Sequence, residues 1–346
     1  MSGDYLWDRS GPRDPDVVRF ERILAPFGQA DPAPPLRAGS AHRARRISRA
    51  FVVATVTAAA AAIVLVAVVY RGPTADAAGF RVTTIAGAPT IGSRSIGGSG
   101  RLPSGRWIET DANARAAIDI ADIGRVELDS DSRLGLVSNR PGDYRMHLVR
   151  GTIQARIWAP PGQFSVETPS ATTVDLGCAY SLTVGDDGAG VVRVTSGWVG
   201  FEWQGRESFI PAGAVCVTRP AIGPGTPYFD DVSDAFRSAI DVIDAGNPRR
   251  PGGVVERRAA IERVLGEARD KDVVTLWHLL SRLEPGERDR VFDVLARFVP
   301  PPASVTRDGI RAGDHTMLDA WWDRLGLGTT DWWRTWKQQW RDRSPR

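Results

Sequence analysis

The most continuous hydrophobic pattern in this chain is an apolar run from 51 to 70 that contains no charged residue, proline or glycine. An α-helix rises about 1.5 Å per residue, so a helix of this length is about 30 Å long and matches the hydrocarbon core of a bilayer. The run therefore predicts one transmembrane helix.

Basic residues in the juxtamembrane segment 37–50 set the direction of this helix. Arg43, Arg45, Arg46 and Arg49 precede the apolar run without an acidic residue among them, whereas Arg71 stands nearly alone after it. Because basic residues stay on the cytoplasmic side, we expect the N-terminus inside and the bulk of the chain outside. The run begins only at residue 51, too late for a secretory signal peptide. We therefore interpret it as a retained anchor rather than a cleaved signal.

A second pattern lies in the N-terminal segment 1–36. Asp14 and Pro15 are typical of a helix start, and apolar residues follow at helical spacing at Val17, Phe20, Leu24 and Phe27. So short a segment cannot bury a core of its own. We expect this apolar stripe to contact either a cytoplasmic partner or the membrane surface.

After a linker at 71–89, residues 90–226 alternate apolar and polar positions in short runs broken by glycine and Asp/Ser turns, which predicts an all-β domain. The clearest predicted strand alternates from Val174 to Val184, with these apolar residues on one face, and ends in a hairpin turn at 185–188. Gly124, Gly151 and Gly197 each start a similar unit, with apolar residues two and four positions later. Such repeated strand units suit a β-sandwich or a β-helical roll.

Residues 227–346 return to helical spacing. We expect helices at 230–244, 254–268, 272–283 and 285–298, the last opened by Pro285 and ended by three prolines at 300–302. Helices of this length joined by short turns predict an all-α bundle or a short α-solenoid. The fold class is thus mixed: a transmembrane helix, an all-β domain and a helical domain.

Half of the 12 tryptophans lie beyond residue 320, and Trp332, Trp336 and Trp340 share one helical face. This aromatic surface could lie on a membrane or bind a partner. The alternative, which we favour, is a terminal helix that packs its large aromatic side chains into the bundle.

Composition and motifs narrow the functional classes. The formal net charge of the 346 residues is only +3, and the basic residues concentrate beside the apolar run, so we expect no direct nucleic-acid binding. The four histidines lie in separate segments, and no G-x-S-x-G, Walker A, dinucleotide-binding or H-E-x-x-H motif occurs. We therefore expect neither an enzyme nor a cofactor site.

The two cysteines, Cys178 and Cys216, both lie in the part predicted to be outside the cytoplasm, where disulfides persist. A bond between them would close a long loop and stabilise the fold by about 4 kcal/mol. The alternative is that both are small apolar residues buried in strands.

Several ordered segments resemble the FecR domain. They are Gly100–Thr110, Ala114–Ile120, Gly124–Leu128, Leu148–Ile153, Phe164–Pro169 and Val174–Leu182. The resemblance implies a single-pass protein of the bacterial inner membrane, with a cytoplasmic N-terminus and the β domain in the periplasm. It also implies a regulator that relays an envelope signal to a sigma factor of the extracytoplasmic-function type.

The N-terminal segment departs from this family pattern because it is short and lacks the His/Cys cluster of zinc-type anti-sigma domains. Trp7 together with the apolar stripe is then a reduced version of the sigma-binding region. The partners expected are the inner membrane, a sigma factor, and an envelope protein or ligand in the periplasm. The alternative function is a membrane-tethered periplasmic scaffold or a binding module for a ligand or protein, without sigma-factor control.

Overall fold

The computed structural model describes residues 79–245 and 251–327. The apolar run at 51–70, the N-terminal stripe, the juxtamembrane arginines and the tryptophans at 332–340 lie outside the described residues. Among the residues described, no helix has the length and apolar character needed to cross a membrane.

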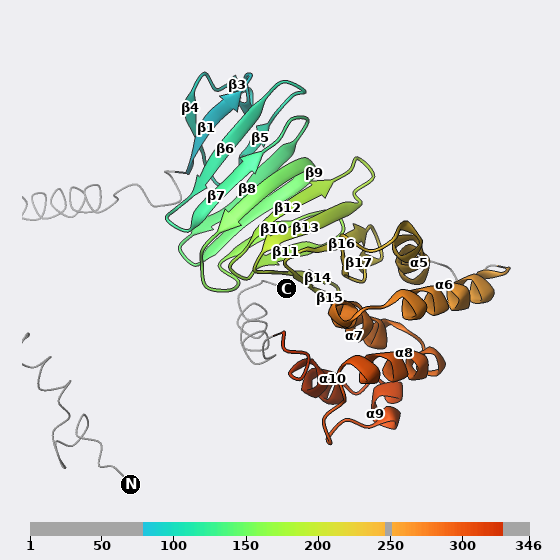
Figure 1. The fold of residues 1–346 in the computed structure, drawn as a ribbon. Helices are drawn as coiled ribbons and strands as arrows, with labels where there is room; N and C mark the ends of the chain where they lie inside the picture. Colours follow the sequence, from blue (N-terminus) through green and yellow to red (C-terminus); the bar gives the residue numbers. More distant parts are fainter. Residues whose placement is uncertain (1–78, 246–250, 328–346) are drawn as a thin grey trace, which may run out of the picture. The chain divides into compact units, whose positions relative to one another are not determined.

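The strands form two sheets. Sheet A consists, in spatial order, of β4 (Ser99–Leu102), β1 (Phe80–Ala86), β6 (Arg115–Ile120), β7 (Gly124–Leu128), part of β9 (Asp143–Ile157), β12 (Ala179–Val184), β13 (Gly190–Ser196) and β16 (Ala214–Arg219), with β17 (Gly223–Pro224) and β18 (Tyr228–Phe229) attached to β16. Sheet B consists of β3 (Arg94–Ser95), β2 (Thr90–Ile91), β5 (Trp107–Glu109), β8 (Arg133–Arg140), the rest of β9, β10 (Phe164–Glu167), β11 (Thr172–Asp175), β14 (Trp198–Trp203) and β15 (Arg206–Pro211). Both sheets are visible in Figure 1.

Strand β9 belongs to both sheets. Its first half pairs with β8 and β10 in sheet B, and its second half, from Gly151 on, pairs with β7 and β12 in sheet A. The change of sheet occurs at Gly151, whose φ is 94°. A Cβ there would lie only 2.0 Å from Ser132 Oγ, so this position requires glycine.

The predicted glycine-led units are confirmed in their inward positions, because Val126, Ile153 and Val199 are all fully buried. Two of the glycines mark changes of sheet rather than tight turns. Gly151 lies inside β9, and Gly197 lies between β13 of sheet A and β14 of sheet B.

The prediction of one strand from Val174 to Val184 was wrong. The segment forms two strands in different sheets, β11 and β12, separated at 176–178. Val174 packs toward the helices, whereas Tyr180 and Leu182 face the core between the sheets. The hairpin turn at 185–188 is confirmed, since Gly185 N–H donates to the carbonyl of Ala189.

The core between the two sheets is mostly apolar. Both sheets contribute fully buried side chains to it, among them Leu102, Ile118 and Val126 from sheet A and Leu134, Met146 and Phe164 from sheet B. Burial of this alternating face holds the two sheets together.

A helical region follows the strands, as the sequence predicted. It contains α5 (Asp234–Ala245), α6 (Gly253–Glu267), the 3₁₀ turn η2 (Asp270–Asp272), α7 (Val273–Arg282), α8 (Pro285–Phe298), α9 (Arg307–Ala312) and α10 (His315–Trp322). Helix α8 has the predicted bounds, with Pro285 at its first position and Glu287 completing a capping box with Glu284.

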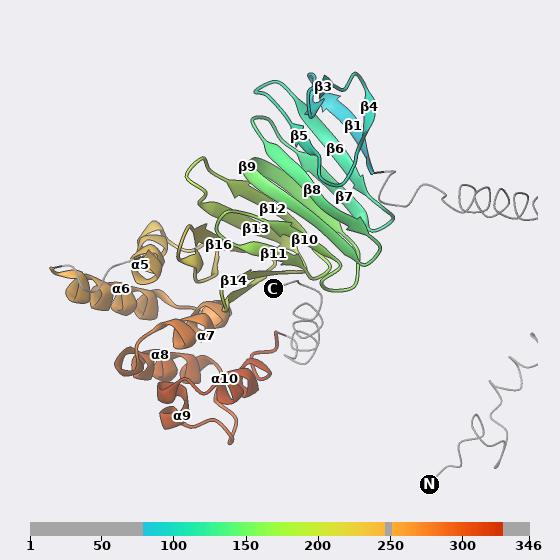
Figure 2. The same cartoon turned by 180° about the vertical axis from the view of Figure 1, so that it is seen from behind.

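The helices pack at the end of the sheets where β14, β15 and β16 lie, as both views show (Figures 1 and 2). A second apolar cluster lies here. It combines Val174, Phe209, Val215 and Tyr228 of the strands with residues of the helices, including Phe236, Leu276 and Trp322. The β and helical regions therefore share one continuous interface.

Candidate functional site

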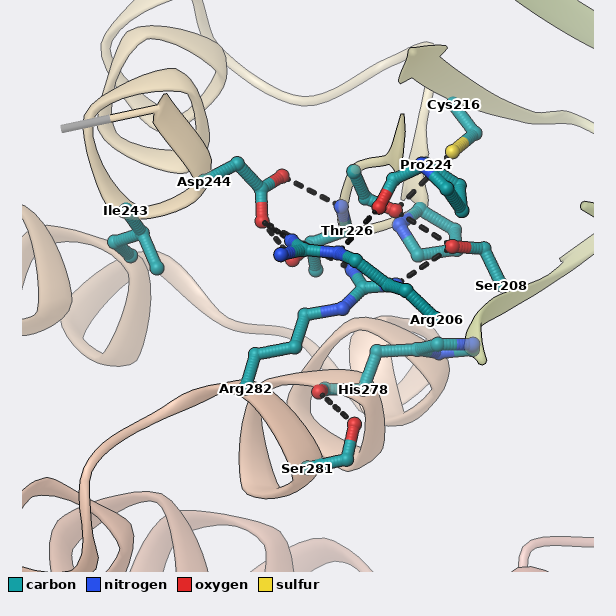
Figure 3. A network of polar contacts seen from close by, with 12 residues as sticks. Arg206, Ser208, Cys216, Pro224, Thr226, Ile243, Asp244, His278, Ser281 and Arg282 are labelled. Carbon is teal, nitrogen blue, oxygen red and sulfur yellow. Dashed lines mark hydrogen bonds and ion pairs between the residues drawn. The ribbon is translucent and has the colours of Figure 1, made fainter. Parts of the chain in front are cut away.

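Polar side chains gather in the interface between sheet B and the helices, and this junction is drawn in Figure 3. Asp244, in the last turn of α5, is its acidic centre and has a side chain only 3% exposed. Its Oδ1 accepts hydrogen bonds from Arg206 Nη2 at 3.1 Å and from Thr226 Oγ1 at 2.9 Å. Its Oδ2 accepts one from the backbone N–H of Thr226. A carboxylate with this many donors is held firmly although it is buried.

Arg282, the last residue of α7, reaches the same region from the opposite side. Its Nη2 donates to Ser208 Oγ at 2.6 Å and to the carbonyl of Glu207 at 2.9 Å. Its Nη1 lies 4.0 Å from Asp244 Oδ1 and has no hydrogen-bond partner among the described residues. Burial lowers the pKa of Arg282 to about 10, although the charge of Asp244 opposes this shift.

His278 completes the link between α7 and β15. Its Nε2 accepts a hydrogen bond from the backbone N–H of Phe209 at 3.0 Å, so Nδ1 carries the proton and donates to the carbonyl of Val274 at 2.7 Å. Burial, reinforced by the charge of Arg282, holds the pKa of His278 well below its usual value. The ring is therefore neutral at physiological pH.

Aromatic side chains surround this polar group. Trp277 and Trp322 lie with ring centroids 4.7 Å apart, and Phe209 of β15 lies 5.4 Å from Trp322. The indole N–H of Trp277 donates to the carbonyl of Leu318. The interface thus combines apolar packing with polar groups that, apart from Arg282 Nη1, are hydrogen-bonded.

The chemistry of this junction is that of a structural link. Ser208 Oγ and Cys216 Sγ both donate to the carbonyl of Gly225, at 2.8 and 3.2 Å, and no base accepts either proton. Burial raises the pKa of Cys216 to about 12, so it remains a thiol. Neither residue is an activated nucleophile.

Of the two alternatives considered for the cysteines, the structure contains no disulfide, since Cys178 and Cys216 are both free and buried. Cys178 donates from its thiol to Asp175 Oδ2 at 2.7 Å, whereas Cys216 donates to the carbonyl of Gly225. Burial raises the pKa of Asp175 to about 7, against the opposing effect of its hydrogen bonds from Cys178 and Gly177. The alternative of two small buried residues describes both cysteines.

Of the site residues that the sequence singled out, only these two cysteines lie in the described part of the chain. The residues of the described part that could hold a metal ion do not cluster in groups of three or more. Sequence reasoning missed Asp244, His278 and Arg282, because they are separated by long stretches of chain. Their only local signal was their position on or beside the apolar face of predicted helices.

Comparisons with known proteins bear on the β region that precedes the polar residues of this junction. The family model described as FecR protein matches residues 106–200. These residues run from β5 into β14 and include the central strands of both sheets. The match confirms the resemblance seen in the sequence for this part of the chain.

Two solved structures are also similar, both described as a "putative anti-sigma factor from Parabacteroides distasonis". They are 14% and 15% identical, each with a TM-score of 0.32, and each covers 46% of this chain. The matched regions amount to 74% and 73% of those chains. No protein of curated function matches this chain.

Proposed function

We propose that this chain is a membrane-anchored regulator that relays a signal from outside the cytoplasm to a sigma factor of the extracytoplasmic-function type. The observation that carries this proposal is the FecR match, which falls on strands of both sheets rather than on one edge. The described region is then the receiving part of a regulator and not an enzyme.

The junction supports a single receiving unit. Arg206 and Ser208 of β15 contact Asp244 of α5 and Arg282 of α7, and aromatic rings pack around them. Interfaces between independently moving domains are usually small and polar. This one has a large apolar cluster with buried charges inside it, which favours β and helical regions that respond together.

The other end of the proposed relay is the N-terminal segment. Its apolar stripe needs a surface to pack against, and the apolar run at 51–70 with its arginines gives a route through a membrane. A sigma factor held by Trp7 and the stripe would be released or retained according to the state of the outer part.

Co-purification of the full chain with candidate sigma factors tests this partner. We expect Phe20→Asp to abolish the complex, because it places a charge in the apolar stripe. Arg22→Asp is the matched control, since Arg22 falls on the opposite face of the predicted helix. Equal binding by both variants, or no sigma factor bound by the parent chain, would overturn the partner assignment.

Membrane anchoring is tested separately. The full chain should remain in membrane vesicles after a wash with alkaline carbonate. A reporter enzyme that is active only in the cytoplasm should be active when it is fused to the N-terminus. Replacing residues 1–36 with an unrelated tail should abolish regulation. Preserved function after this replacement would favour the alternative, a tethered periplasmic scaffold or binding module.

A further inference from the structure

Two adjoining hollows lie on the outer face of sheet A, away from the junction, and share the side chains of Arg125 and Trp158. The larger has a volume of about 570 Å³ and the smaller about 210 Å³. The larger lies within the range of about 300–1,000 Å³ that is usual for ligand pockets. Together they form a continuous depression on both sides of Trp158.

Trp158 is the most exposed large hydrophobic side chain among the described residues, at 76%. It follows the last residue of β9, and its backbone N–H donates to the carbonyl of Ile123 at 2.7 Å. The next residue, Ala159, packs against the core between the sheets. The backbone under the indole is therefore anchored, and the exposed indole itself takes little part in packing the core.

Arginines extend from this indole across neighbouring strands in one row. The cross-strand register places Arg101, Arg81, Asp119, Arg125 and Arg156 side by side on β4, β1, β6, β7 and β9. Arg125 is paired with Asp119 at 2.7 Å, and Arg101 donates to the carbonyl of Gly79. Arg81 and Arg156 are exposed and form no ion pair with any described residue.

Acidic groups are interspersed in this surface and limit the charge of what it can bind. The side chains of Asp119 and Asp122 line the larger hollow, and Glu127 lines the smaller one. The two hollows together are lined by four arginines and three carboxylates, so their net charge is too small to favour a ligand with a phosphate on every unit, such as a nucleic acid or an anionic bilayer. A ligand with many hydroxyls and few acidic groups would use both the donors and the acceptors.

We propose that Trp158 and the surrounding arginines bind an oligosaccharide that carries carboxylates on some of its rings. One sugar ring stacks its apolar face on the indole, and neighbouring rings occupy the two hollows. Arg81 and Arg156 bind the carboxylates, for which the guanidinium geometry is suited. Asp119 and Asp122 accept hydrogen bonds from the hydroxyls of the sugar, and the amide of Gln154 can both accept and donate. This site is independent of whether residues 1–36 bind a sigma factor.

Isothermal titration calorimetry of the full chain in neutral detergent tests the proposal. The probe is the hyaluronan tetrasaccharide, which has a carboxylate on every second ring, and the neutral comparison is the N-acetylglucosamine tetramer. We expect the acidic tetrasaccharide to bind at least about tenfold more tightly than the neutral one, because two arginines gain ionic partners.

Variants assign the binding to this surface. Trp158→Ala should lower the affinity for the acidic tetrasaccharide by about tenfold or more. The double variant Arg81→Gln with Arg156→Gln should bind the acidic and the neutral tetrasaccharide with equal affinity. Arg193→Gln is the matched control, since Arg193 is exposed on β13 of the same sheet outside both hollows. Thermal unfolding followed by circular dichroism should give the same midpoint for all variants, because the altered side chains are exposed.

Absence of binding by the parent chain would overturn the proposal, as would equal binding of the two tetrasaccharides. Unchanged affinity in Trp158→Ala would also overturn it. Tighter binding of oligothymidylate, or of the water-soluble lipid dihexanoyl phosphatidylglycerol, would show that the surface binds a nucleic acid or lipid headgroups instead.

Discussion

The core between the two sheets and the junction with the helices exclude different groups from water. Between the sheets most of the fully buried side chains are apolar, such as Leu128, Met146 and Phe164, and the buried carboxyl of Asp175 is bonded to the Cys178 thiol rather than to an arginine. At the junction, an equally extensive apolar cluster surrounds Asp244 and Arg282, whose side chains are 3% and 5% exposed.

This difference indicates which substitutions each region tolerates. An apolar core loses stability in proportion to the volume removed, because each lost group takes its own contacts with it. A buried ion pair adds little net stability, but removal of one partner leaves the other charged and desolvated. The junction should therefore be the more sensitive of the two to a change in a single polar atom.

The largest effect is expected for Asp244→Ala. This variant leaves Arg206 and Arg282 without their shared carboxylate, which should lower the free energy of unfolding by about 3–5 kcal/mol. Urea unfolding followed by circular dichroism measures it. Asp241→Ala is the matched control on the same helix, because Asp241 is half exposed and its pair with Arg219 should contribute at most about 1 kcal/mol. Similar losses in the two variants would remove the distinction between the regions.

Met146→Ala is the corresponding test of the core between the sheets. Met146 is fully buried on β9, and truncation should lower the free energy of unfolding by about 2–5 kcal/mol. Val137→Ala on the adjacent β8 removes an exposed side chain and should change it by less than about 0.5 kcal/mol. If the regions form one unit, Met146→Ala should also shift the unfolding of the helices, recorded in the far ultraviolet. Two separate transitions would argue against that unit.

The free energy of unfolding should depend on pH with opposite signs for Asp175 in the β region and His278 in the junction. Asp175 has a pKa of about 7 in the folded chain against 3.8 when unfolded, so the folded state binds a proton more readily. Its contribution is fully present below pH 3.8 and is lost as the pH rises through about 7. Relative to Asp175→Asn, the parent chain should gain about 1.4 kcal/mol per pH unit on acidification between these limits.

His278 acts in the opposite direction. Its folded pKa lies well below 6.5, so its contribution is present above pH 6.5 and is lost as the pH falls further. The parent chain should therefore lose stability relative to His278→Gln on acidification. Urea midpoints measured from pH 8 to pH 5 for the parent chain and the two variants give the dependence of stability on pH for each residue. Slopes of the same sign would contradict the buried environments described for Asp175 and His278.

The smallest effect is expected from reducing agents. With Cys178 and Cys216 free, dithiothreitol should leave the unfolding midpoint unchanged. Alkylation in urea without reductant should add two groups per chain, observed by mass spectrometry. A chain that resists alkylation until it is reduced would establish the disulfide that the structure does not contain.

Elements with strong local patterns could be predicted from the sequence. Helix α8 was predicted with its observed bounds because Pro285 and the three prolines at 300–302 mark both ends. The succession of a β domain and a helical region was also predicted, since the spacing of apolar residues changes from two to between three and four near residue 230.

What depends on contacts between distant residues could not be predicted. The alternation through 174–184 continues across the bend at Gly177, so nothing in it revealed that β11 and β12 belong to different sheets. Asp244 and Arg282 are brought together by the packing of α5 and α7 on β15, which leaves no periodic trace in the sequence. Trp158 continues the alternation of β9 by one residue, which already places it on the outward side, but only the structure shows that it shares a hollow with Arg81 and Arg125.

Strand β9 has a length that evolution cannot freely alter. Before Gly151 its buried residues have even numbers, Tyr144, Met146 and Leu148, and after it they have odd numbers, Ile153, Ala155 and Ile157. A single residue inserted after Gly151 would turn the second set to solvent and leave the first in place, because side chains alternate along a strand. Homologues can gain or lose residues in the connecting turns, but a viable insertion in this strand would have to come in pairs.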